Sequence, residues 1–113
     1  MNSMMRRDDR QIISLLMVDA HHGDARAQRL LALRYRRGRG VGQNDELAAE
    51  WMKKAAMQGL SLAERDLGTF YHHGIGVVRD LQQALQLYRS AAQQGDPIAK
   101  KYIQEMAQIK PAK

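Results

Sequence analysis

Arginines are concentrated in one short stretch of this chain. Six of them lie within 14 residues, and among acidic residues only Asp24 is nearby: Arg26, Arg29, Arg34, Arg36, Arg37 and Arg39. The planar guanidinium group donates two parallel hydrogen bonds that match the geometry of a carboxylate. The stretch therefore predicts either a surface that binds acidic groups or an ordinary solvated basic face.

Two histidine pairs, His21–His22 and His72–His73, are candidate metal ligands. Adjacent residues of a helix point about 100° apart, so neither pair can close a chelate by itself. No third ligand stands at a suitable spacing, and the chain has no cysteine. We therefore predict no metal site, and expect these histidines at helix C-terminal ends, where the helix dipole favours them.

The remaining chemical motifs have structural explanations. The glycines over 38–42 resemble a phosphate-binding loop, but a helix precedes them where the dinucleotide fingerprint needs a strand. The serines are scattered, and none lies in a nucleophile elbow. Glu46 and Glu50 lie one helical turn apart with lysines following, which is typical of a solvated helix face. We expect no enzymatic activity and no cofactor.

Composition sets the class of protein. The 113 residues carry a net charge of +6, with 44% hydrophobic residues and no cysteine, which excludes disulfide scaffolds and iron–sulfur clusters. No apolar run has the length of a membrane span. The apolar stretch 12–18 is at the lower limit for a secretion signal, and Asp8 and Asp9 interrupt its positive flank. We expect one soluble, basic domain in the cytoplasm.

The sequence repeats with a period of 36 residues. Gly23, Gly59 and Gly95 stand one period apart. Ten further residues of the first period recur unchanged in the second: Ala27, Leu31, Tyr35, Gly38, Gly40, Val41, Ala48, Ala55, Ala56 and Gln58. A period of this length predicts a solenoid of stacked supersecondary units.

Apolar residues within each period recur at intervals of three and four, which predicts helices. Asn44, Asp80 and Asp96 are expected N-caps, and Asp80 can form a capping box with Gln83. Gly74 is expected to close a helix in the left-handed conformation. The six predicted helices cover about 9–21, 24–37, 44–58, 60–73, 80–94 and 96–109.

Small residues are expected where neighbouring helices approach closely. Ala32 and Gly68 should face Ala48 and Ala84. The third period has Gln104 at this position. A large polar residue there suits a helix with no following partner, so the last helix is predicted to be a solubilising cap.

These motifs resemble the Sel-1-like repeat, a branch of the tetratricopeptide-type α-solenoids. The resemblance covers about residues 10–103 and rests on 23–28, Leu31, Tyr35, 38–41, Ala48, Trp51 and 53–59, and on their counterparts in the second period. It implies an all-α fold, a short right-handed α–α solenoid of about two and a half repeats. The single domain 1–113 would comprise a flexible N-terminus 1–8, a half-repeat helix 9–22, repeats 23–58 and 59–94, a capping helix 95–109 and a tail 110–113.

The resemblance also implies where a partner binds. In such solenoids the first helix of each repeat lines the concave face. Carried onto this chain, the partner-binding positions are Arg26, Arg29, Leu33, Arg36, Arg37, Leu62, Arg65, Thr69, His72, His73, Ile98 and Lys101. The expected groove is basic, with apolar patches at Leu33, Leu62 and Ile98.

The function implied by the resemblance is a protein–protein interaction scaffold. Our leading hypothesis is an adaptor that binds an acidic peptide or protein surface in the basic groove. An inhibitor or immunity-type protein that caps an effector is an alternative. A nucleic-acid-binding role is less favoured, because no recognition module is visible and no aromatic residues alternate with the cations. The end helices could also pair in a homodimer, through the apolar face of the first one.

Overall fold

The computed structural model describes residues 2–108, and the side chains of residues 8–108, as six α-helices. In chain order these are α1 (Asn2–His21), α2 (Ala25–Arg37), α3 (Asp45–Met57), α4 (Ser61–His73), α5 (Leu81–Gln93) and α6 (Pro97–Ala107). No strand occurs between residues 2 and 108. The predicted all-α class is confirmed. The predicted tail, 110–113, lies outside the described residues.

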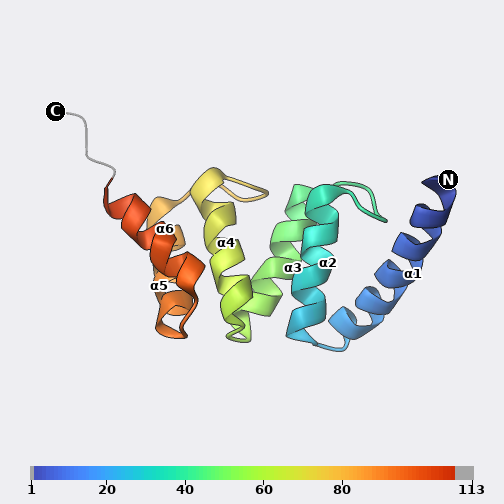
Figure 1. The fold of residues 1–113 in the computed structure, drawn as a ribbon, viewed down its shortest axis with the longest axis horizontal. Coiled ribbons are helices and arrows are strands. Elements are labelled where there is room, and N and C mark those ends of the chain that lie inside the picture. The colour runs from blue at the N-terminus through green and yellow to red at the C-terminus, as the bar shows by residue number, and fades with distance from the viewer. Residues whose placement is uncertain (1, 109–113) are drawn as a thin grey trace.

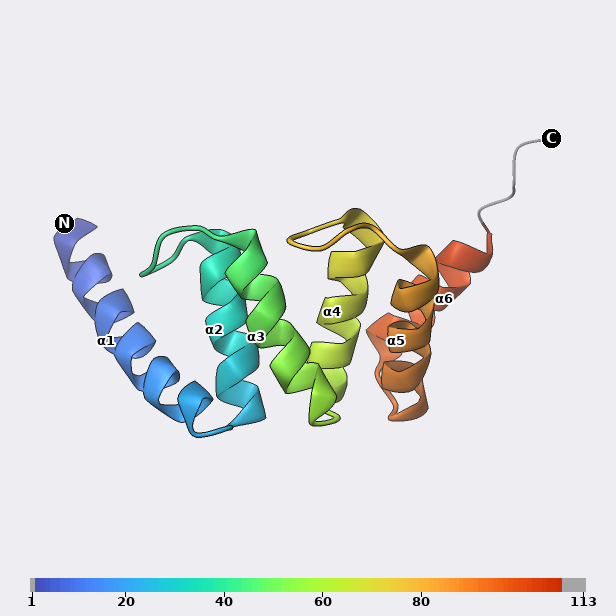
Figure 2. The ribbon, with the colours of Figure 1, turned by 180° about the vertical axis from the view of Figure 1, so that it is seen from behind.

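The helices follow one another along the molecule as a solenoid (Figure 1). Each helix packs mainly against its neighbours in sequence. The view from behind shows the α2–α3 connection and the α4–α5 connection at the same edge of the molecule (Figure 2). The 36-residue period of the sequence is therefore a period in space. No helix in this part of the chain is both long and apolar enough to cross a membrane.

The first helix is longer than predicted. It begins at Asn2, whereas the apolar pattern predicted a start near residue 9 after a flexible segment. Residues 2–8 contain methionine and arginine but no glycine or proline, and a helix tolerates this composition. The apolar pattern could not mark this start, because it begins only at Ile12.

Capping side chains fix the starts of three helices as predicted. Asn44, Asp80 and Asp96 each accept hydrogen bonds from backbone N–H groups in the first turn of α3, α5 and α6. The capping box predicted between Asp80 and Gln83 is wrong. The backbone N–H of Asp80 donates to the carbonyl of Tyr71 at 2.8 Å, so this amide is not free for the Gln83 side chain.

Small residues lie at the contacts between paired helices. Ala32 of α2 and Ala48 of α3 are fully buried, as is Ala84 of α5. A β-carbon added to Gly68 of α4 would lie 2.7 Å from Cε1 of Tyr88 and 3.3 Å from the Ala84 carbonyl oxygen. The predicted close approach is confirmed, and only glycine fits at position 68 unless the Tyr88 ring moves.

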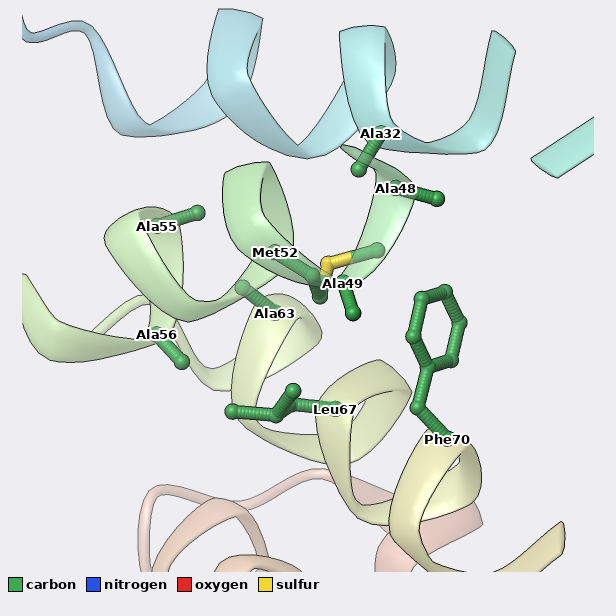
Figure 3. Close-up of a cluster of buried hydrophobic side chains, with 9 residues drawn as sticks. All are labelled: Ala32, Ala48, Ala49, Met52, Ala55, Ala56, Ala63, Leu67 and Phe70. Atoms are coloured by element: carbon green, nitrogen blue, oxygen red, sulfur yellow. The ribbon is translucent and has the colours of Figure 1, made fainter. Parts of the chain in front are cut away.

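The largest apolar cluster lies between α2, α3 and α4 (Figure 3). Its buried members are Ala32, Ala48, Ala49, Met52, Ala55, Ala56, Ala63, Leu67 and Phe70. Six of these nine are alanines, so the core depends on short distances between backbones more than on large side chains. In α6, Gln104 is exposed.

The loop between α2 and α3 packs against α1, and the loop between α4 and α5 packs against α3. Gly38 and Gly74 close α2 and α4 in the left-handed conformation, with φ of 70° and 71°. Two residues further on, a β-carbon at Gly40 would lie 2.8 Å from Cγ1 of Ile13. At Gly76 it would overlap the carbonyl oxygen of Asp45. Glycine is therefore required at position 76 for close contact as well as for its backbone conformation.

Alanine substitutions at the two glycines of one loop separate these requirements. Gly74→Ala should cost about 1–2 kcal/mol, the penalty of a left-handed alanine, because its β-carbon has room. Gly76→Ala has a similar positive φ of 67° and in addition drives a methyl group into backbone. It should cost at least ~3 kcal/mol. Urea unfolding measures both, and equal costs would contradict the docking of this loop on α3.

One face of α1 is apolar and exposed. Ile12, Leu15 and Val18 are 39%, 67% and 54% exposed. These three residues recur at intervals of three along the helix, so they form a stripe.

Pairing of two copies through this stripe stays a prediction. If it occurs, the wild-type protein should have about twice the monomer mass by light scattering at high concentration, and Leu15→Glu should return the mass to that of a monomer. A monomeric wild type at every concentration would contradict it.

Candidate functional site: a groove on the inner helices

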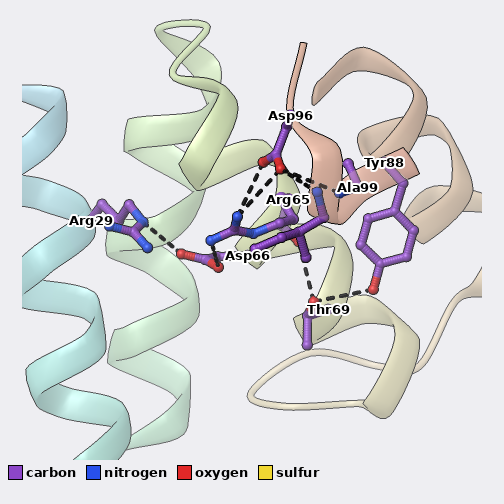
Figure 4. Close-up of polar contacts among 8 residues, drawn as sticks. Arg29, Arg65, Asp66, Thr69, Tyr88, Asp96 and Ala99 are labelled. Carbon is purple, nitrogen blue, oxygen red and sulfur yellow. Dashed lines mark hydrogen bonds and ion pairs between the residues drawn. The ribbon is translucent and has the colours of Figure 1, made fainter. Parts of the chain in front are cut away.

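Polar contacts connect α2, α4 and α6 across one face of the solenoid (Figure 4). These are the first helices of successive repeats, which the sequence predicted to line the concave face. Arg29 lies on α2, Arg65, Asp66 and Thr69 on α4, and Asp96 immediately before α6. The side chains at the predicted positions of α2 and α4 therefore share a surface.

A single ion pair spans the space between α2 and α4. Nε of Arg29 lies 2.6 Å from Oδ2 of Asp66, and the two side chains are 19% and 17% exposed. We call this pair the crossbar. It neutralises one of the cations that the predicted groove was expected to offer to a partner.

Arg65 is also neutralised from within the protein. Its Nη1 lies 3.2 Å from Oδ2 of Asp96, and its Nη2 lies 3.5 Å from Oδ1 of Asp66. Asp96 is itself buried and caps α6 by accepting from the backbone N–H groups of Ile98 and Ala99. Arg65 is thus a structural link between α4 and α6.

The guanidinium groups of three of the six clustered arginines lie within 3.3 Å of a carboxylate oxygen, and those of the other three do not. Arg34 and Arg39 both contact Oδ1 of Asp9 on α1, at 3.0 Å and 3.3 Å, and so hold α1 against α2 and its loop. Arg29 belongs to the crossbar. The other three, Arg26, Arg36 and Arg37, lie on α2, and among them only Arg36 forms an ion pair with an acidic side chain of residues 8–108, Asp45 at 3.9 Å.

Two hollows lie between α2 and α4, one on each side of the crossbar. The first hollow has a volume of about 390 Å³ and is lined by Arg26, Arg29, Leu30, Leu60, Ser61 and Leu62. The second hollow has a volume of about 340 Å³ and is lined by Leu33, Arg36, Arg37, Asp66, Thr69, Phe70 and Ile75. Each hollow therefore combines apolar side chains with arginines.

Several predicted positions do not join these hollows. His72 and His73 stack on each other, with ring centroids 4.5 Å apart and planes 4° apart. Lys101 is exposed and lies 3.9 Å from Glu105 one helical turn away. Ile98 is 41% exposed on α6. These four residues and Arg65 lie outside the lining of both hollows, so the hollows cover only part of the predicted surface.

Asp66 is the most important residue that the sequence analysis missed. It is the only acidic residue lining either hollow within the described part of the chain. Nothing in the sequence around Asp66 indicated its role, because the number of charges in a segment does not show which carboxylate pairs with which arginine. Leu30 and Ile75 were also missed, although both are apolar residues beside predicted positions.

The histidines do not gather a metal site. Within residues 8–108, no group of three or more histidine, cysteine, aspartate or glutamate side chains is placed to hold a metal ion. Nδ1 of His21 lies 2.7 Å from the Met17 carbonyl oxygen, and its ring packs edge-on against Trp51 at 5.0 Å. His21 therefore has a structural role at the end of α1.

The acid–base behaviour of His72 follows from its surroundings. Nδ1 of His72 lies 3.4 Å from the hydroxyl oxygen of Tyr88. Burial lowers the pKa of His72 below its ordinary value of 6.5, and the positive charges of His73 and Arg79 lower this pKa further. The folded state thus favours the neutral imidazole.

Acidification should therefore weaken the fold through His72. Because the folded pKa is below the unfolded one, the stabilisation is complete above about pH 6.5 and falls as pH decreases toward the folded pKa. Urea unfolding at about pH 7.5 and about pH 5.5 should show a smaller loss of stability in His72→Gln than in the wild type. An equal loss in both proteins would contradict this role for His72.

Comparisons with known proteins agree with the repeat geometry. The family model described as Sel1 repeat matches residues 25–60 and 61–96. A solved Sel1 repeat protein from Oxalobacter formigenes is 40% identical with a TM-score of 0.80, and the match covers 82% of this chain and 70% of that one. No curated protein sequence matches the chain.

Two further solved structures share the fold. A protective antigen of uropathogenic Escherichia coli with an SLR fold is 33% identical with a TM-score of 0.78. The match covers 80% of this chain but only 20% of the antigen. The cysteine-rich protein B of Helicobacter pylori is 23% identical with a TM-score of 0.76, over 80% of this chain and 68% of that one. This last likeness concerns the fold alone.

Proposed function

The chain belongs to the Sel1 repeat family, whose repeats mediate protein–protein interactions, and from this premise we propose that it is a scaffold holding an acidic segment of a partner protein between α2 and α4. The observation that carries the proposal is the pair of hollows between α2 and α4, which combine arginines with leucines, two of which are exposed in the first hollow.

Charge supports an acidic partner at α2. Arg26 and Arg37 are exposed and form no ion pair with any acidic side chain of residues 8–108. Arg36 has only the distant contact with Asp45. A guanidinium group that is free on one face can bind a carboxylate through two hydrogen bonds. Farther along the groove, Asp66 and Asp96 already neutralise Arg65, so the attraction for an acidic segment is concentrated on α2.

Exposed apolar side chains support a peptide or protein as the partner. Leu30 is 45% exposed and Leu62 is 40% exposed, and both line the first hollow. Covering such side chains removes apolar surface from water and stabilises the complex. A small inorganic anion would leave them uncovered.

The Sel1 repeat is a non-catalytic scaffold type, and we propose that this chain has no enzymatic activity of its own and acts in the cytoplasm. The groove would serve equally in an adaptor and in an inhibitor that caps an effector. The activity of the captured partner, measured with and without this protein, separates these two roles.

Charge reversal in the groove tests the proposal. Arg36→Glu combined with Arg37→Glu should abolish capture of the partner. The melting temperature should be nearly unchanged, since exposed cations contribute only ~0–1 kcal/mol to folding. Arg29 is a poor choice for this test, because its substitution breaks the crossbar.

The matched control reverses two lysines of α3, Lys53→Glu with Lys54→Glu. Both lysines are exposed, and neither lines the groove between α2 and α4. This variant should capture the partner as well as the wild type does. Equal capture by the groove variant and the wild type would refute the proposed binding surface.

A further inference from the structure

The crossbar divides the floor of the groove into two separate compartments. The Arg29–Asp66 pair is mostly buried and joins α2 to α4, so a bound segment has to pass over it. The first hollow lies toward the N-terminal ends of both helices, and the second hollow lies toward their C-terminal ends. Space for the side chains of a bound segment therefore lies on both sides of the crossbar but not at it.

The spacing of the hollows follows from the helix geometry. Corresponding lining positions differ by seven residues on α2, from Arg29 to Arg36, and by seven on α4, from Leu62 to Thr69. At about 1.5 Å of rise per residue, the two hollows lie about 10 Å apart. Both helices give the same offset, so the two walls of the groove agree on the distance between the hollows.

A polyproline II segment brings two side chains close to this spacing with no side chain between them on the same face. A polyproline II segment has three residues per turn and rises about 3.1 Å per residue, so side chains three apart share one face at about 9 Å. Side chains on one face of a β-strand lie about 7 Å or about 13 Å apart. An α-helix reaches about 10 Å only with seven residues, and the side chains between would press on the crossbar.

The positions of the free arginines set where the acidic residues lie. Arg26 is in the first turn of α2 and lines the first hollow. Arg37 ends α2 and lines the second hollow. A segment that runs along α2 therefore meets a cation at each end, with the apolar side chains Leu30 and Leu33 between them.

Resting on the proposed function, we infer that the partner presents an extended, polyproline II-like segment. This segment carries two apolar side chains three residues apart, one for each hollow, with an acidic residue outside each of them. The order and spacing of the apolar and acidic residues in a segment, and not its acidity alone, then determine whether it binds.

Two synthetic peptides of identical composition test this inference. The probe is Glu-Leu-Pro-Pro-Leu-Glu with blocked ends, which has leucines three residues apart, and its control is Glu-Leu-Pro-Leu-Pro-Glu. Titration of isotope-labelled full chain, followed by NMR, should give about tenfold weaker binding for the control, since one leucine then stays in water. The probe should shift the amide signals of α2 and α4.

Variants of the protein locate each leucine. Leu62→Asn in the first hollow and Leu33→Asn in the second should each weaken the probe about tenfold. Met57→Asn is the matched control, because Met57 is 87% exposed and lies outside both hollows. Where Leu33→Asn fails to fold, Arg37→Gln replaces it and should weaken the probe but not a probe in which both glutamates are glutamine.

The outcomes separate the two proposals. Equal affinity for both peptides, with signals shifting on α2 and α4, would overturn the spacing and leave the groove as the binding surface. Shifts confined to α3 and α5 would overturn the groove itself. No binding of either peptide at up to ~1 mM would overturn the inferred segment, while capture of the natural partner by wild type but not by Arg36→Glu/Arg37→Glu would still support the groove.

Discussion

Close contact between small residues sets the geometry on which the rest of the molecule depends. Ala32 is fully buried against α3, and a β-carbon at Gly68 would lie 2.7 Å from the Tyr88 ring of α5. The two helices of each repeat therefore pack closely together. A residue without a side chain is also required at Gly76, where the loop of the second repeat contacts α3 of the first. Because both repeats are built alike, α2 and α4 lie on the same face with the same register. The groove is a consequence of this packing.

Internal ion pairs determine which arginines are neutralised by a carboxylate of the protein itself. The net charge of +6 suggests a uniformly basic protein, yet the arginines of α2, of the loop after it and of α4 are not equivalent. Arg34 and Arg39 hold α1, while Arg29 and Arg65 link α2, α4 and α6 through Asp66 and Asp96. Removing one member of such a partly buried pair destabilises the protein, because the other charge is left without a partner. Arg26 and Arg37, which form no ion pair with an acidic side chain of residues 8–108, lie at the two ends of α2.

Sequence periodicity was sufficient to predict the fold but only part of the groove. Gly74 and Asp96 have roles that local chemistry dictates, and both were predicted correctly. The pairing of Asp66 with Arg29 depends on two residues 37 positions apart, and no local pattern records it. The start of α1 was missed for a different reason, since residues 2–8 have no apolar stripe. Ion pairs between repeats were thus among the features that needed the structure.

Hydrogen exchange of the full chain, alone and with its captured partner, shows whether the partner binds between α2 and α4. Amide protection increases where a bound segment covers the backbone or holds its hydrogen bonds closed. The account predicts new protection along α2 and α4, on both sides of the crossbar, with α3 and α5 unchanged. Protection that appears on α3 and α5, or on α1 alone, would contradict binding in this groove.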